Sequence, residues 1–481
     1  MPGQVIRVYP ASGGVAMLPL TPENDYTPTI IFCGGSTMNE FQWGNFSFPF
    51  ANTWEIPASK DCQTITPEPA DKSAPRYVQD DDMPEGRSMG QFIILPDGKL
   101  LMVNGAMNGT AGYSQATMFV HSYSEMPFGE SLASGPALTP AIYDPKAPKG
   151  KRWSKAGLKP SKIPRMYHSS AMLLPDASVF IAGSNPNVDV NLTTVFPTTY
   201  EAEIFYPPYF ELQRPEPKGF PSTLSYGGAY FNITIPASSY SGSANAAAES
   251  AIVSVLRGGF TTHAMNMGQR FLQLKNTFTV QQDGTIILHV SQMPPKPEVF
   301  QPGPAFVYVV INGAPSTGHY VIVGSGKIET QPKLPEATLP PSVRVDSAKG
   351  SGSGKSNNAG GDSASSSGMS MTTIIAIAAG GLVVLGLIFG IWFMRRRKAA
   401  ARKTTTTALP MATTGGMGAG GVAATTYGND SSAFVPLKQG QSGWNDSSAS
   451  LVAPYKDNAY GPQDQSSSYS RPSYDPNGRR Y

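Results

Sequence analysis

The sequence predicts an all-β protein that is followed by one membrane-spanning helix and a polar tail. Of the 481 residues, 50 are glycine and 44 are proline, whereas charged residues make up only 14%. Many short strands separated by Gly/Pro turns are typical of a β-sandwich or a β-propeller. The formal net charge of +3 is too small to indicate a nucleic-acid-binding protein.

Residues 1–212 contain three similar units, each with an apolar strand, a turn and a second apolar strand that ends in small residues. The units are residues 15–36, 86–106 and 165–185. The Leu-Pro-Asp turns of the second and third units lie 79 residues apart, which exceeds the roughly 50 residues of a kelch repeat. We therefore expect a partial, kelch-type propeller of three or four blades with long insertions, above all surface loops at 107–162.

Residues 213–328 show the pattern of a compact antiparallel sandwich. Their length of roughly 110 residues suits an immunoglobulin-like domain. The expected strands alternate apolar with polar residues between Gly, Pro and Asn turns, and they lie at 230–236, 251–256, 285–291 and 305–311.

An apolar segment at 373–394 has the length of a transmembrane helix. Its 22 residues carry no charge, and at ~1.5 Å per residue they span about 33 Å, enough for the ~30 Å hydrocarbon core. Arg395-Arg396-Arg397-Lys398 follow at once, so the positive-inside rule predicts a single-pass type I protein with a cytosolic C-terminus. Gly386 and Gly390 form a G-x-x-x-G pair that favours a homodimer, although glycine is also simply frequent in membrane helices.

The segments around this helix are of low complexity. Residues 329–370 are rich in Pro, Gly and Ser, which predicts a flexible linker. The cytosolic tail, 395–481, has few large aliphatic residues, so we expect it to be disordered. Residues 1–11 lack the basic start and apolar run of a signal peptide. Because that conflicts with export, we expect the sequence to begin inside a longer chain.

The cysteines and sequons point to the secretory pathway. Cys33 and Cys62 are either a disulfide or two buried thiols, and an oxidising compartment favours the disulfide. Four N-x-S/T sequons predict N-glycosylation in the same part of the chain, at Asn45, Asn108, Asn191 and Asn232.

Two segments offer ligands for copper. Tyr167 and His168 are adjacent, and His263 lies in Thr261-Thr262-His263. Two neutral imidazoles and a phenolate oxygen suit copper(II), which favours N,O ligands. Because adjacent residues on a regular strand point to opposite faces, Tyr167 and His168 must lie at a strand start or a bend to reach one metal. The alternative is a half-buried tyrosine and a histidine that is hydrogen-bonded in a sheet. His121, His289 and His319 are isolated and are weaker candidates.

Residues 3–328 closely resemble the C-terminal half of the glyoxal oxidase and galactose oxidase family of copper radical oxidases. Four segments carry the resemblance in the same order and spacing, at 165–185, 201–210, 258–271 and 301–323. The resemblance implies a seven-bladed propeller, an early set domain that sends a loop into its channel, and one copper ion. It also implies that Tyr167 is the axial ligand and proton acceptor, and that His168 and His263 are the equatorial ligands.

One departure from the family bears on catalysis. The family's one-electron store is a second tyrosine, which is thioether-linked to a cysteine and lies in an Arg-Trp-Tyr-Pro segment. The sequence has no Arg-Trp-Tyr-Pro, and neither cysteine falls where the cross-linking cysteine would. We therefore expect a membrane-anchored oxidase of small aldehydes or primary alcohols that reduces O2 to hydrogen peroxide but is represented without its radical half-site. The alternative is a non-catalytic cell-surface propeller protein that lacks the radical cofactor.

Overall fold

The computed structural model describes residues 2–39, 42, 48–263, 265–346 and 433–437. The expected transmembrane helix at 373–394 and its Gly386/Gly390 pair lie outside these residues, as do residues 347–370 of the expected flexible linker. The structure describes the linker's first part, 329–346, in which Lys333–Glu336 form a strand. Within the described ranges, no helix is long and apolar enough to cross a membrane.

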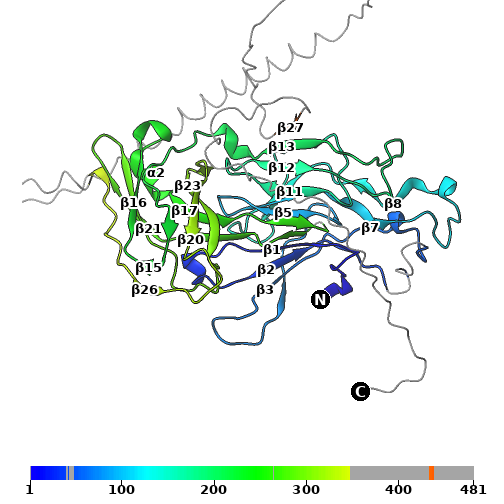
Figure 1. The fold of residues 1–481 in the computed structure, drawn as a ribbon, viewed down its shortest axis with the longest axis horizontal. Coiled ribbons are helices and arrows are strands. Elements are labelled where there is room, and N and C mark those ends of the chain that lie inside the picture. The colour runs from blue at the N-terminus through cyan, green and yellow to red at the C-terminus, as the bar shows by residue number, and fades with distance from the viewer. Residues whose placement is uncertain (1, 40–41, 43–47, 264, 347–432, 438–481) are drawn as a thin grey trace, which may run out of the picture.

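The first 206 residues supply eleven of the twelve strands of three four-stranded antiparallel sheets, which lie one beside the next in Figure 1, and residues 433–437 supply the twelfth. Each expected unit provides the first two strands of one sheet. The innermost strand of the second sheet, β5, contacts those of the first and third sheets, β1 and β11. The first sheet contains β1 (Gly14–Met17), β2 (Ile30–Cys33), β3 (Cys62–Ile65) and β4 (Tyr77–Gln79). The second contains β5 (Gln91–Ile94), β6 (Leu100–Val103), β9 (Ala141–Tyr143) and β10 (Trp153–Ser154). The third contains β11 (Ser170–Leu173), β12 (Val179–Ala182), β13 (Ala202–Tyr206) and β27 (Ala433–Leu437).

Continuous burial explains the apolar runs of the central sheet. All four residues of β5 and all four of β6 are buried, because neighbouring sheets cover both faces. The turn between them needs a left-handed residue, and Gly98 fills it with a φ of 84°. The matching turn of the third sheet has Ala177 with a φ of 71°, a conformation that costs an alanine roughly 1–2 kcal/mol.

The 107–162 region contains more than the surface loops that we expected. A long hairpin is formed there by β7 (Ala106–Tyr113) and β8 (Pro127–Pro136). These strands are rich in Gly, Ser and Ala, so no run of large apolar residues marks them in the sequence. In Figure 1 the hairpin projects away from the second domain.

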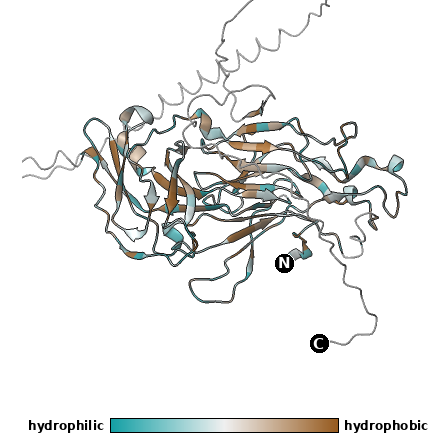
Figure 2. Ribbon diagram, viewed as in Figure 1, coloured by the Kyte–Doolittle hydropathy of each residue, from teal (hydrophilic) through white to brown (hydrophobic). Residues whose placement is uncertain are grey.

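The second domain is a β-sandwich, and all four of its expected strands are present within two residues of their expected bounds. One sheet has the order β14 (Thr223–Leu224), β25 (His319–Val323), β23 (Gly303–Ile311), β17 (Ile252–Arg257) and β20 (Arg270–Leu274), with β24 (Ala314–Pro315) beside β23. The facing sheet contains β16 (Phe231–Ile235), β22 (Ile286–Val290) and β21 (Asn276–Val280). The helix α2 (Ala244–Glu249) and the pair β15 (Tyr226–Gly228) and β26 (Lys333–Glu336) complete the domain. Hydrophobic residues concentrate on the strands in Figure 2, and hydrophilic residues on the loops.

The two cysteines are bonded to each other in the structure, across the paired positions of β2 and β3. Of the expected glycosylation sites, Asn232 is exposed, whereas Asn108 and Asn191 are half-buried. The side-chain amides of these two donate to the hydroxyls of Ser134 and Tyr123. Asn45 lies outside the described residues.

The tail is not wholly without structure, contrary to our expectation. Residues 433–437 form β27, which pairs antiparallel with β13. The low apolar content of the tail as a whole concealed this one short segment, Ala-Phe-Val-Pro-Leu.

Candidate metal centre

Tyr167 and His168 occupy a turn immediately before β11. His168 has a φ of 64°, in the left-handed region that few residues other than glycine adopt. The turn stacks the two rings against each other, with their centroids 3.8 Å apart. The expected strand start or bend is therefore present, and it is what brings the two rings to one place. Strained backbone of this kind concentrates at functional sites.

A buried arginine holds this turn against the third sheet. Arg165 donates from Nε and Nη2 to one carboxylate oxygen of Glu203 in β13, at 3.0 and 2.9 Å. Its Nη1 donates to the backbone carbonyl groups of Gly183 and Glu201. The two charged side chains are only 2% and 3% exposed. Burial lowers the pKa of Arg165, and the charge of Glu203 opposes that shift.

His263 comes from the second domain, at the tip of a hairpin formed by β18 (Phe260–Thr262) and β19 (Met265–Met267). This hairpin lies against the inner strands of the first domain. Thr261 Oγ1 donates to the carbonyl group of Ala171 in β11 at 3.0 Å, and Gln269 Nε2 donates to that of Phe92 in β5 at 2.7 Å. His263 also has a left-handed backbone, with a φ of 51°. His263 therefore lies on a connection of the second domain that reaches the inner strands of the first domain.

Tyr9 links the Tyr167–His168 turn to His263. The hydroxyl oxygens of Tyr167 and Tyr9 lie 3.4 Å apart, and the Tyr9 ring meets the His263 ring edge-on at 5.8 Å between centroids. Tyr167 is 7% exposed and Tyr9 is 45% exposed. Burial, and then the hydrogen bond with Tyr9, raise the pKa of Tyr167 well above its ordinary value. Two phenols and two imidazoles therefore gather at one partly open place.

Both imidazoles have a partner at Nδ1. His168 Nδ1 lies 2.9 Å from the carbonyl oxygen of Asn185. Because a carbonyl group only accepts, Nδ1 carries the proton and Nε2 keeps its lone pair. His263 Nδ1 lies 2.8 Å from Thr262 Oγ1. Such contacts fix the orientation of a metal-binding histidine, and the sequence did not identify these partners.

The donor set fits copper. Two imidazole nitrogens with phenol oxygens are ligands that copper(II) accepts in tetragonal N,O coordination. No group of three or more His, Cys, Asp or Glu residues that could hold a metal occurs in the part of the chain that the structure describes. The donors that lie together here are two imidazoles and the tyrosine oxygens.

Tyr9 is the site residue that the sequence reasoning missed. It lies in Arg7-Val8-Tyr9-Pro10, which differs from the expected Arg-Trp-Tyr-Pro only by valine in place of tryptophan. A repeat could have revealed it, because each inner strand is preceded by an arginine, at positions 7, 87 and 165. The side chain of Arg7 forms an ion pair with Asp61, much as Arg165 does with Glu203. If the first unit is started at Arg7 rather than at residue 15, Tyr9 aligns with Tyr167.

The remaining candidates are engaged elsewhere. The His289 ring contacts Asn232 Oδ1 and Thr279 Oγ1 at 2.8 and 2.9 Å, and the His319 ring stacks on Phe220. His121 stacks on Phe48. Cys33 and Cys62 are the two cysteines of the sequence and are bonded to each other.

Two family matches cover the two domains. Residues 1–209 match the family described as glyoxal oxidase N-terminus, and residues 214–323 match the family described as galactose oxidase-like, Early set domain. The boundary between the two matches falls where the first domain ends and the β-sandwich begins.

Two curated proteins and one solved structure resemble the chain over about two thirds of its length. The chain is 32% identical over 324 residues to the putative aldehyde oxidase Art an 7 of Artemisia annua, a match that covers 66% of this chain and 49% of that protein. It is also 32% identical over 324 residues to the aldehyde oxidase GLOX of Vitis pseudoreticulata, again over 66% of this chain and over 54% of that protein. The chain thus spans about half the length of the curated relatives it matches. A solved structure titled as a novel fungal alcohol oxidase in complex with copper aligns with a TM-score of 0.45 and 19% identity, over 65% of this chain and 53% of that one.

Proposed function

We propose that this protein is a copper radical oxidase that oxidises small aldehydes or primary alcohols. A primary alcohol would lose two electrons and two protons to become an aldehyde, and O2 would take them up to become hydrogen peroxide. A small aldehyde would react as its hydrate and give the acid. The observation that carries the proposal is the gathering of Tyr9, Tyr167, His168 and His263 from three separate segments.

Each residue has a role in the proposal. His168 and His263 would hold copper through Nε2, and Tyr167 and Tyr9 would supply the phenol oxygens. Bound copper would supply a Lewis acid and a one-electron acceptor. The Tyr167 oxygen would accept the substrate hydroxyl proton, and Tyr9 would stand in the place of the family's one-electron store.

The three four-stranded sheets would be blades of a kelch-type propeller. The sequons, the disulfide and the similarity to aldehyde oxidases support an exported protein. Export, the membrane anchor at 373–394 and its homodimer through Gly386 and Gly390 stay predictions.

A specific observation favours the alternative, a non-catalytic surface protein with the same scaffold. The family cross-links its radical tyrosine to a cysteine, whereas both cysteines of this sequence form the Cys33–Cys62 bond. This sequence therefore offers no free thiol for a thioether bond to Tyr9. A tyrosine without that thioether is harder to oxidise, so the scaffold could bind copper and still turn over poorly.

Metal analysis and peroxide assays separate the two functions. We expect one copper ion per chain, and loss of it in His168→Ala and His263→Ala, because each removes one of few ligands. His319→Ala, which removes a histidine outside the site, is the matched control. Unchanged copper content in both site variants would refute the site. Copper binding without peroxide formation from glyoxal or a primary alcohol would leave the non-catalytic alternative.

A further inference from the structure

The outer edge of β13 is occupied by a strand from far along the chain. Residues 433–437 pair with it in antiparallel register, with Phe434 opposite Phe205 and Pro436 opposite Glu203. Figure 1 shows β27 as the outermost strand of the third sheet. This pairing gives the third sheet four strands, as in the first and second sheets.

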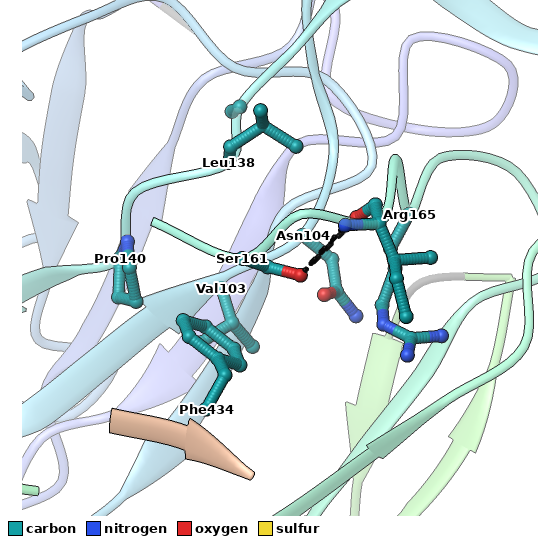
Figure 3. A pocket seen from close by; sticks show the side chains of 9 residues that line it. Val103, Asn104, Leu138, Pro140, Ser161, Arg165 and Phe434 are labelled. Carbon is teal, nitrogen blue, oxygen red and sulfur yellow. Dashed lines mark hydrogen bonds between the residues drawn. The ribbon is translucent and has the colours of Figure 1, made fainter. Parts of the chain in front are cut away.

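Phe434 is the side chain that holds this strand. Its ring lies 5.0 Å from that of Phe205, between centroids, and it is half-buried. It also lines a cavity of about 10 Å³ together with Val103 of β6, Pro140 just before β9, and Arg165. Figure 3 shows the Phe434 ring directed from β27 toward Val103 and Pro140. The cavity has room for about one water molecule, so Phe434 fills a gap between two sheets rather than bordering a substrate pocket.

The edge of β13 needs such a cover. Without β27 it would present unpaired N–H and C=O groups beside apolar side chains, which is a template for aggregation. Proline lacks an N–H and is tolerated mainly on edge strands. Pro436 therefore suits the last strand of a sheet, where it also discourages a further strand from pairing.

We propose that residues 433–437 are an intramolecular closing strand of the third sheet, anchored by Phe434, and that the tail consequently lies on the same side of any membrane as the β domains. A single molecule cannot form the β13–β27 pairing and also keep residues 395–481 in the cytosol while its sheets are outside. The proposal and the type I arrangement expected from residues 373–398 therefore exclude each other, and the topology experiment below decides between them. The proposal does not depend on copper or on catalysis.

Hydrogen exchange of the purified full-length chain tests the pairing. Phe434→Asp places a charge against Phe205 and Val103 and removes apolar contacts that hold β27. The β13 amides that do not bond to β12 should therefore exchange at least about tenfold faster. Trp444→Asp is the matched control, because it makes the same kind of change in the tail outside the strand. Equal exchange in β13 for both variants would overturn the proposal.

The chain carries its own reporters for the side of the membrane. The sequons Asn429 and Asn445 flank the closing strand, and they can be glycosylated only in the secretory lumen. In microsomes that glycosylate Asn232, we expect added protease to leave the tail intact and glycan on at least one of the two sequons. Removal of the tail by protease from the cytosolic side, while the β domains stay protected, would overturn the proposal. Protection of the tail supports it even if neither sequon is used.

Discussion

The buried Arg165–Glu203 pair offers the sharpest test of how the fold positions the site. Glu203→Gln keeps the size of the side chain but leaves the guanidinium of Arg165, which is 2% exposed, without a counter-charge. Leaving one partner of a buried ion pair uncompensated costs on the order of 3–5 kcal/mol. With a urea m-value of up to about 3 kcal/mol per molar, the unfolding midpoint should fall by at least about 1 M.

The matched control is Glu336→Gln on the surface. Glu336 accepts from Lys275 Nζ at 2.6 Å, but these side chains are 37% and 44% exposed, so the loss should stay within about 1 kcal/mol. A double variant, Arg165→Met with Glu203→Leu, removes both buried charges and should recover most of the stability. It should still bind less copper, because the links from Arg165 to the carbonyl groups of Gly183 and Glu201 are gone. A Glu203→Gln protein no less stable than Glu336→Gln would refute this account.

Three further predictions concern single features. Tyr9→Phe removes the hydroxyl that lies 3.4 Å from that of Tyr167. We expect this variant to retain copper, to show a changed copper absorption spectrum and to form peroxide only at background level. An unchanged spectrum would exclude Tyr9 from the site. Replacing both cysteines by serine opens a loop with a sequence separation of 29, which should lower the free energy of unfolding by about 3–4 kcal/mol. Urea titration with and without reductant measures this loss of stability. Equal stability of the oxidised and reduced wild type would contradict the prediction. Burial lowers the pKa of His289 below its ordinary value of 6.5. The unfolded chain therefore binds a proton at His289 more readily than the folded chain does, and the free energy of unfolding should fall as the pH drops below 6.5. His289→Gln should flatten this part of the plot of stability against pH, and an unchanged slope would refute the role of His289.

The sequence by itself determined most strands and three of the four site rings, those of Tyr167, His168 and His263. Apolar runs broken by Gly and Pro turns are local signals, and they located the paired strands of all three units and four strands of the sandwich. Tyr167 and His168 were found because they lie in one short motif, and His263 because it lies in another. The hairpin at 106–136 was missed because its small residues make no apolar run, and burial there comes from contact with other segments.

Only the tertiary structure decided which groups meet. Tyr9 and Tyr167 are 158 residues apart, and they come together because successive sheets place the residue two positions after each arginine at the same inner end. The partner of His168 Nδ1 is a backbone carbonyl, an atom that every residue carries and that no sequence pattern can single out. The same is true of β27, since the edge of β13 exists only once the third sheet has folded. Neighbours along the chain can be read from the sequence, whereas the metal centre and the closing strand depend on distances that only the folded sheets establish.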